Sequence, residues 1–324
     1  MKKLILSLLF AISLVELTAQ DTPHRIKNLK ITILSTMLAE HGSIGEWGFS
    51  ALVEADSIKI LFDTGNGQNQ AVLENSKKLD IQLADVQTLI LSHWHGDHTG
   101  SWLPLRNEIG KINKNAFSVT HTAEGLFDTR IRRRGGENNL RQQDSLLYTR
   151  TDGQIIVHRN FDEIFPGIYL TGPVPRKYPE KNYTLDGKAG KKKDALGNIV
   201  EDNIPEDMSL IIQTENGLVL LSGCGHSGLI NTITYAKSML PQQNLLAAIG
   251  GFHLLLNTDE QIKWTAEQLK ETGLRYFMGA HCTGIEPVYQ IREWAGLKRG
   301  ECIVGSVGAI FELDKGFATG PLTR

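Results

Sequence analysis

Four side chains that bind transition metals lie close together in the segment LSHWHGDHTG, residues 91–100. They are His93, His95, Asp97 and His98. Imidazole nitrogens and carboxylate oxygens are donors that bind Zn or Fe at neutral pH. Alternate side chains of an extended segment point the same way, so His93 and His95 can share one ion, and Asp97 and His98 in the following turn can face a second. We therefore expect a metal centre of one or two Zn²⁺ ions, with Mn or Fe as alternatives.

A metal centre of this kind indicates an enzyme that catalyses hydrolysis. In paired-metal sites the ions lie about 3.5–4 Å apart, and a shared water becomes a hydroxide nucleophile because its pKa falls toward 7. Such a hydroxide attacks an electrophilic carbonyl or phosphorus without a serine or cysteine nucleophile. We expect Asp97 to handle the proton of this step. A lone histidine most often solvates a loop or caps a helix, but four ligands at this spacing favour the metal.

The elements that must position these ligands alternate along the chain. Apolar runs broken by glycine-rich segments predict strands between residues 31 and 63, and the apolar run 86–93 predicts a strand buried on both faces that ends in the histidine cluster. The sequence ENGLVLL, inside the hairpin predicted over 209–223, carries the strongest turn signal. Helices are predicted from near Asp97 and over 69–79, 229–239 and 258–272, and further strands over 117–120, 245–250, 274–280 and 302–312.

The stretch 125–205 differs from the rest of the chain. It is polar, weakly periodic and carries two basic runs, RIRRR at 130–134 and KAGKKKD at 188–194. Charge runs are usually solvated, so we interpret both as surface. Long irregular segments are functional or disordered, and we interpret this one as an insertion that lies over the site as a lid.

The H-x-H-x-D-H pattern after a strand resembles the signature of the metallo-β-lactamase superfamily. FDTG (62–65) and AHCTG (280–284) resemble its earlier Asp-bearing strand end and its late histidine. GCGHSG (223–228), GGFHL (250–254) and TGPVPR (171–176) resemble the branch named for 7,8-dihydropterin-6-yl-methyl-4-(β-D-ribofuranosyl)aminobenzene 5'-phosphate synthase. The resemblance implies an α/β fold, the αβ/βα four-layer sandwich, as a single domain over residues 20–324 with the metals at one edge.

The resemblance also implies the ligand set, which is His93, His95, Asp97, His98 and His281, with His226 as a sixth. The superfamily usually places a bridging Asp after the later strand, but this sequence has Gly223 and Cys224. Cys224 is then a soft ligand or a small buried residue, unless His226 substitutes or Asp207 enters from the neighbouring strand.

Two further residues have functional interpretations. His253 follows a predicted strand and is a ligand, a proton donor or a substrate anchor, of which we favour the last two. Arg176 lies in a segment that resembles the branch, and arginine pairs with phosphate or carboxylate, so we expect it to bind an anionic substrate. His24, His121 and His158 have no motif around them and are interpreted as surface or packing residues.

Composition and the N-terminus set the cellular context. The 324 residues hold 34 Lys+Arg, 36 Asp+Glu and 41% hydrophobic residues, as ordinary globular proteins do, and the net charge of −2 does not favour nucleic-acid binding. Lys2 and Lys3 precede an apolar run at 4–17, and this pattern predicts a cleaved signal peptide over residues 1–19. We therefore expect the protein to be exported to the periplasm or secreted, with no membrane attachment after cleavage. Three cysteines leave at least one free, metal-bound or paired between chains. Nothing in the sequence indicates a particular oligomeric state.

The sequence therefore favours a metal-dependent hydrolase of a small anionic ester, phosphodiester or lactone. The alternative is a transferase like the branch's synthase, which the predicted export disfavours because its substrates are intracellular. A β-lactamase is weakened by the GCGHSG departure and the long insertion. A non-catalytic binding module is weakened by the intact first ligand cluster.

Overall fold

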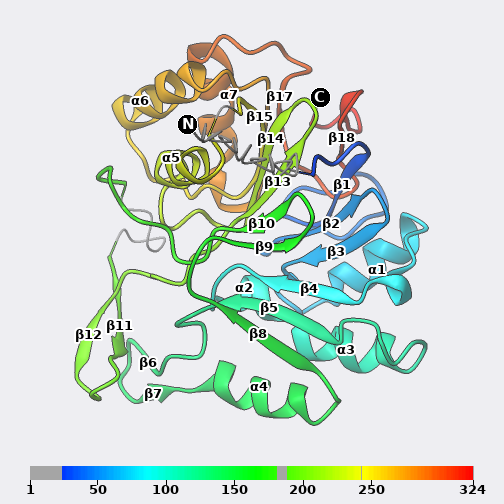
Figure 1. The fold of residues 1–324 in the computed structure, drawn as a ribbon, viewed down its shortest axis with the longest axis vertical. Helices are drawn as coiled ribbons and strands as arrows, with labels where there is room; N and C mark the ends of the chain where they lie inside the picture. Colours follow the sequence, from blue (N-terminus) through cyan, green and yellow to red (C-terminus); the bar gives the residue numbers. More distant parts are fainter. Residues whose placement is uncertain (1–23, 181–187, 242, 324) are drawn as a thin grey trace, which may run out of the picture.

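Two β-sheets lie face to face between two layers of helices in the computed structural model, which describes residues 24–180, 188–241 and 243–323 (Figure 1). This arrangement confirms the predicted four-layer αβ/βα sandwich. The predicted signal peptide lies outside the described residues. Within the described ranges, no helix has the length and apolar character needed to cross a membrane.

The first sheet has eight strands in the order β19-β18-β1-β2-β3-β4-β5-β8. The pairs from β3 through β8 are parallel and the others antiparallel. The strands are β1 (Leu29–Ser35), β2 (Ser50–Ala55), β3 (Ile58–Phe62), β4 (Thr88–Leu91), β5 (Val119–Ala123), β8 (Gln154–His158), β18 (Ile310–Glu312) and β19 (Gly316–Ala318).

The second sheet has seven strands in the order β17-β16-β15-β14-β13-β10-β9. Its pairs from β14 through β17 are parallel, so the C-terminal ends of β14, β15 and β16 meet at one edge. The strands are β9 (Asp162–Phe165), β10 (Ile168–Leu170), β13 (Leu210–Thr214), β14 (Gly217–Ser222), β15 (Leu245–Gly250), β16 (Tyr276–Gly279) and β17 (Cys302–Val304).

Alternation along the strands divides the apolar residues among three cores. Ile60 and Phe62 of β3 pack between the sheets, whereas Leu61 packs toward the helices of the first sheet. In β14, Val219 faces the other sheet and Leu220 faces helices. Both faces of these strands are buried, which explains why their sequences are continuous apolar runs.

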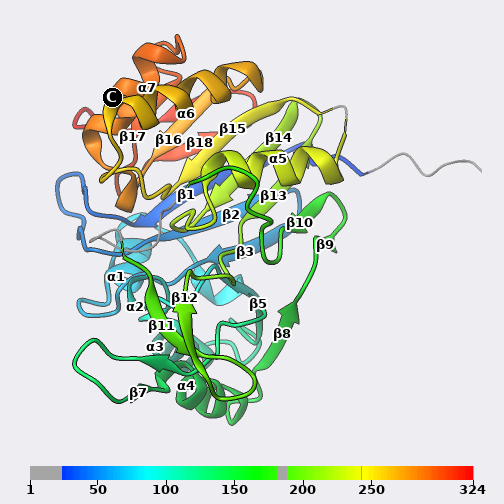
Figure 2. The same cartoon turned by 90° about the vertical axis from the view of Figure 1, so that its left-hand side faces the viewer.

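Helices cover the outer face of each sheet, as Figure 2 shows from the side. The helices over the second sheet are α5 (Leu229–Met239), α6 (Asp259–Glu271) and α7 (Ile285–Trp294). Those on the first sheet's side are α1 (Ala71–Lys78), α2 (Gly96–Thr99), α3 (Trp102–Gly110) and α4 (Leu140–Thr149). Short 3₁₀ turns precede β4, as η1 (Leu83–Asp85), and follow β16, as η2 (His281–Thr283).

The predicted helices and the hairpin lie where the sequence indicates. Helix α6 begins with a capping box in which Thr258 and Gln261 satisfy each other's backbone N–H groups. In the hairpin, Thr214 pairs with Gly217, so Glu215 and Asn216 form the turn and Gly217 begins β14. The turn is thus one residue earlier than an Asn-Gly turn would be.

The stretch 125–205 contains more regular structure than its weak periodicity indicates. Its β8, β9 and β10 extend the two main sheets. The remainder includes α4 and a separate sheet in the order β12-β11-β6-β7, seen at the lower left of Figure 1. The strands of that sheet are β6 (Arg130–Ile131), β7 (Glu137–Asn138), β11 (Gly190–Lys193) and β12 (Ile199–Asp202).

Arg130 anchors this small sheet to the sandwich. Its side chain is 3% exposed, and its guanidinium pairs with Asp202 at 3.2 Å and with Glu206 at 2.7 Å. It also donates to the carbonyl of Gly125. The prediction of a solvated run is therefore wrong for Arg130, because buried acids accept its charge, although Arg132 is exposed.

Replacing Arg130 should destabilise the fold strongly. Arg130→Met leaves the buried carboxylates of Asp202 and Glu206 without their cation, so we expect a loss of about 3–5 kcal/mol in the free energy of unfolding. Urea denaturation would measure it. Arg132→Met, in the same run but exposed, should stay within about 0.5 kcal/mol of wild type. Equal stability of the two variants would show that the buried ion pairs contribute nothing.

Candidate metal centre

The predicted metal-binding histidines meet at one edge of the sandwich, where strands of both sheets end. The HWHGDH segment follows β4 of the first sheet, and three strand ends of the second sheet supply the rest. His226 follows β14, His253 follows β15 and His281 follows β16. Binding groups gathered at the carboxyl ends of parallel strands are typical of α/β sites.

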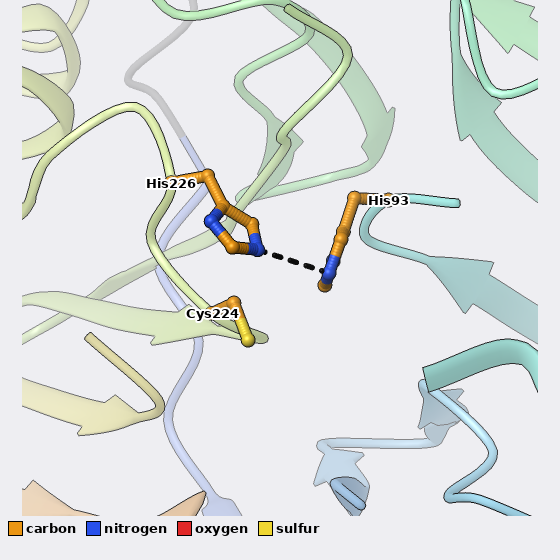
Figure 3. Close-up of side chains that lie close together, drawn as sticks. All are labelled: His93, Cys224 and His226. Atoms are coloured by element: carbon orange, nitrogen blue, oxygen red, sulfur yellow. Dashed lines mark hydrogen bonds between the residues drawn. The ribbon is translucent and has the colours of Figure 1, made fainter. Parts of the chain in front are cut away.

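His93 lies between two other imidazoles. Its Nε2 is 3.0 Å from Nδ1 of His95 and 3.3 Å from Nε2 of His226. Figure 3 shows the ring nitrogens of His93 and His226 directed at each other, with Cys224 near His226. Ligand atoms of His93, Cys224 and His226 all lie within 4.8 Å of one another.

A second group adjoins the first and shares Cys224 with it. Cys224 Sγ is 3.1 Å from Nε2 of His98, and ligand atoms of His98, Cys224 and His281 again lie within 4.8 Å of one another. Nε2 of His281 is 3.3 Å from Oδ2 of Asp97, whose side chain remains 18% exposed. The arrangement thus offers two neighbouring ligand groups with a sulfur atom in common.

The geometry fits a metal ion. Nε2 of His93 can carry one proton at most, yet the ring nitrogens of His95 and His226 both approach it. A Zn–N distance of about 2.0–2.1 Å places tetrahedral nitrogen ligands about 3.3 Å apart, close to both separations. The six predicted ligands and Cys224 supply nitrogen, oxygen and sulfur donors, which suit a borderline-soft ion.

Asp63 orients two of the histidines from behind. Its carboxylate is fully buried and accepts hydrogen bonds from Ser92 N, Ser92 Oγ and His98 Nδ1, each at 2.7 Å. Ser92 Oγ is in turn 2.9 Å from Nδ1 of His93. Occupying both Nδ1 atoms leaves the Nε2 atoms of His93 and His98 directed at the site, as outer partners of metal-bound histidines do.

Electrostatics distinguish the histidines of the centre. Burial and the neighbouring imidazoles lower the pKa of His93 well below its usual value, and burial lowers the pKa of His95 to about 4. Burial acts in the same direction at His98, but Asp63 outweighs it and raises the pKa to about 9. Burial opposes ionisation of Asp97, but His281 and the nearby imidazoles hold its pKa well below the usual range. His93 and His95 therefore present neutral nitrogen lone pairs, and Asp97 presents a carboxylate.

Close backbone approach brings the strand ends together. A Cβ on Gly223 would lie 2.5 Å from Oδ2 of Asp63, and one on Gly250 would lie 1.9 Å from the Ser222 carbonyl oxygen. Asp63, His253 and His281 all have positive φ, at 56°, 48° and 47°. Such conformations in non-glycine residues cost of order 1–3 kcal/mol and gather at functional sites.

Two predicted residues are placed outside these ligand groups. Asp207 accepts a hydrogen bond from Ser227 N at 2.8 Å through Oδ2, so it supports the loop that carries His226. Arg176 donates from Nη2 to the carbonyl oxygens of Asn203 and Ile204 at 2.6 and 3.1 Å. Both act on the protein's own loops here, and the role of Arg176 toward a substrate stays a prediction.

The structure adds residues that the sequence reasoning did not select. Cys282 Sγ lies 3.2 Å from Cys224 Sγ. The indole of Trp47, 38% exposed, packs edge-on against His281 with 5.1 Å between ring centroids. Sequence adjacency was an available signal for two of the neighbours, because Cys282 follows His281 and Ser92 precedes His93. No spacing pattern indicated Trp47.

The three histidines interpreted as surface or packing residues do not join this cluster. His121 and His158 are buried and bond to each other at 2.9 Å, and His158 also bonds to Asp162 at 2.7 Å. His24 lies 3.8 Å from the carboxylate of Asp56. Their placement agrees with packing or surface roles.

The fold is that of the metallo-β-lactamase superfamily, whose family profile matches residues 48–114. The chain belongs to this superfamily. It is 31% identical over 274 residues, 81% of this chain and 90% of the relative, to the 7,8-dihydropterin-6-methyl-4-(β-D-ribofuranosyl)-aminobenzene-5'-phosphate synthase of Methanocaldococcus jannaschii. The resemblance to that branch is thereby confirmed. An uncharacterised protein of the same organism is 28% identical over 81% of this chain and 94% of its own length.

Solved structures agree. Tm1679, described as a metal-dependent hydrolase of the β-lactamase superfamily, is 25% identical and superposes with a TM-score of 0.70 over 88% of this chain and 99% of its own. YhfI of Bacillus subtilis, a metallo-β-lactamase fold protein, has a TM-score of 0.53 at 16% identity over 88% of this chain and 100% of its own, and shows the shared fold.

Asp63→Asn should weaken metal binding. The asparagine amide would present a donor to Nδ1 of His98, which favours the tautomer whose proton occupies Nε2 and blocks coordination there. We expect metal affinity to fall by about 10–100-fold, as with other outer partners of ligating histidines, in competition with a chromophoric chelator. Asp56→Asn is the matched control because Asp56 also has positive φ, at 50°, but lies outside the centre. Equal affinities of the two variants would contradict the orienting role of Asp63.

Proposed function

We propose that this protein is a metal-dependent hydrolase of small anionic esters, phosphodiesters or lactones. The observation that carries the proposal is the pair of adjoining ligand groups that share Cys224. A bound divalent metal supplies Lewis-acid polarisation of the scissile oxygen and activation of water at neutral pH. The description of the similar Tm1679 structure as a metal-dependent hydrolase supports the same reaction class.

The chain's own residues would divide the remaining tasks. Asp97 is partly exposed, so its carboxylate can accept a hydrogen bond from an attacking water and help to pass its proton on to solvent. His93 and His226, with His95 beside His93, would hold one ion, and His98 and His281 the other. Trp47 provides an exposed aromatic surface beside His281, where the apolar part of a substrate can pack.

Zn²⁺ is the ion that we propose, with Mn or Fe as alternatives. The proposed partner is a small anionic molecule, and the proposed location is outside the cytoplasm after cleavage of residues 1–19. Imidazole and thiolate donors favour Zn²⁺ over ions that prefer oxygen.

A second candidate is a transferase that joins a pterin to a phosphorylated ribosyl-aminobenzene. The 31% identity to the M. jannaschii synthase, over 90% of that protein, supports it. Incubation with both substrate types and a mass-spectrometric search for the joined product would separate the two candidates.

Chelation and removal of one ligand should both abolish hydrolysis. We expect the metal-loaded protein to turn over at least one of a phosphodiester, an ester and a lactone, and dialysis against a chelator to remove the activity. His95→Ala should lower kcat/KM by more than about 100-fold, because losing a ligand exceeds the effect of losing its outer partner. His24→Ala, a half-exposed histidine outside the centre, is the control. Turnover that survives both chelation and His95→Ala would disprove the metal-dependent mechanism.

A further inference from the structure

Two thiols lie side by side beneath the histidine centre. Cys224 and Cys282 are 2% and 1% exposed, and their sulfur atoms are 3.2 Å apart. Neither is in a disulfide. They come from different strand ends, since Cys224 follows β14 and Cys282 lies in η2 after β16. Two sulfurs are thus buried together at the edge of the sheet where ligands gather.

His253 reaches the same place from the strand between them. Ligand atoms of Cys224, His253 and Cys282 all lie within 4.8 Å of one another. The backbone of His253 has φ of 48°, and its ring centroid is 4.8 Å from that of His226. Because β15 is hydrogen-bonded to both β14 and β16, the three donors occupy adjacent strand ends.

We propose that Cys224, His253 and Cys282 form a sulfur-containing metal position that shares Cys224 with the histidine centre and takes a thiophilic divalent ion, Zn²⁺ in the first instance. Two thiolates and an imidazole are a donor set of structural and catalytic zinc sites, and thiolates disfavour Mg²⁺, Ca²⁺ and Mn²⁺. The proposal touches the proposed function through Cys224, whose sulfur also belongs to both ligand groups of the histidine centre. Of the roles open to His253, its neighbours favour that of a ligand.

Hydrogen bonds can satisfy the thiols when no metal is bound, with the Cys282 S–H directed at Cys224 Sγ and the Cys224 S–H at Nε2 of His98, 3.1 Å away. The proposal therefore rests on the convergence of three ligand atoms within 4.8 Å at adjacent strand ends. A disulfide needs the sulfurs to come to about 2.05 Å, which would move them more than about 1 Å closer. A bound ion would let both thiols release their protons to solvent.

The site can be tested without an activity assay. Protein purified under reducing conditions, freed of metal and reloaded with Co²⁺, should show a thiolate-to-cobalt charge-transfer band in the near ultraviolet. Cys282→Ser should lower that band by about half, because one of two thiolate ligands is lost, and should reduce Zn²⁺ by one equivalent in elemental analysis. Cys302→Ser is the matched control, because Cys302 is also buried but bonds to the Val288 carbonyl.

Further arms keep the result decisive. His253→Ala retains both thiols and should also lose one equivalent of Zn²⁺, which covers the case in which Cys282→Ser does not fold. A band and metal content that are equal in Cys282→Ser, His253→Ala and Cys302→Ser would overturn the proposal. So would an intact mass showing a Cys224–Cys282 disulfide in protein that still carries its full metal. Wild-type protein that shows neither the band nor hydrolysis of any substrate would overturn both proposals. Wild-type protein that shows the band without hydrolysis would disprove only the hydrolase.

Discussion

The buried carboxylate of Asp63 accepts three hydrogen bonds, and each of them fixes part of the metal centre. A charge taken out of water is tolerated only where donors replace the lost hydration, and Ser92 and His98 provide those donors. Because His98 Nδ1 is occupied, a proton and a metal ion compete for its Nε2 alone. Ser92 extends the same network to His93, so one aspartate at the end of β3 sets the direction of two ligands.

The two halves of the centre meet because several backbones approach more closely than side chains would allow. Ser92 O accepts from Met208 N at 3.0 Å, which joins the end of β4 to the segment before β13. Gly223 faces Asp63 and Ser92 across the two sheets, so any side chain there would displace the carboxylate that orients His98. The glycines in GCGHSG and GGFHL thus serve the geometry of the ligands as directly as the histidines do.

The main strands and the first ligand cluster could be predicted because apolar runs and H-x-H-x-D-H are local patterns, whereas the four layers were predicted from the family resemblance. The sequence located β13 and β14 through a turn signal that is also local. It could not place Cys282 beside Cys224, because these residues are 58 positions apart in the sequence. Nor could it assign Arg130 to the interior, because its acidic partners lie 72 and 76 positions away. The regular structure of 125–205 was missed because its strands are short and polar, and because β6 pairs with β11 and β10 with β13 across long stretches of sequence.

Arg130 also limits how the small sheet β12-β11-β6-β7 can move relative to the centre. Its guanidinium lies 4.8 Å from the ring centroid of Trp94, which separates His93 from His95 in the sequence, and it pairs with Glu206 beside Asp207. Asp207 accepts a hydrogen bond from Ser227, the neighbour of His226, so Arg130 contacts segments that lead to both ligand loops. Moving the base of this sheet would separate buried charges at a cost of several kcal/mol. Arg130 therefore fixes the base of this sheet, whereas the turn at 132–136 is exposed.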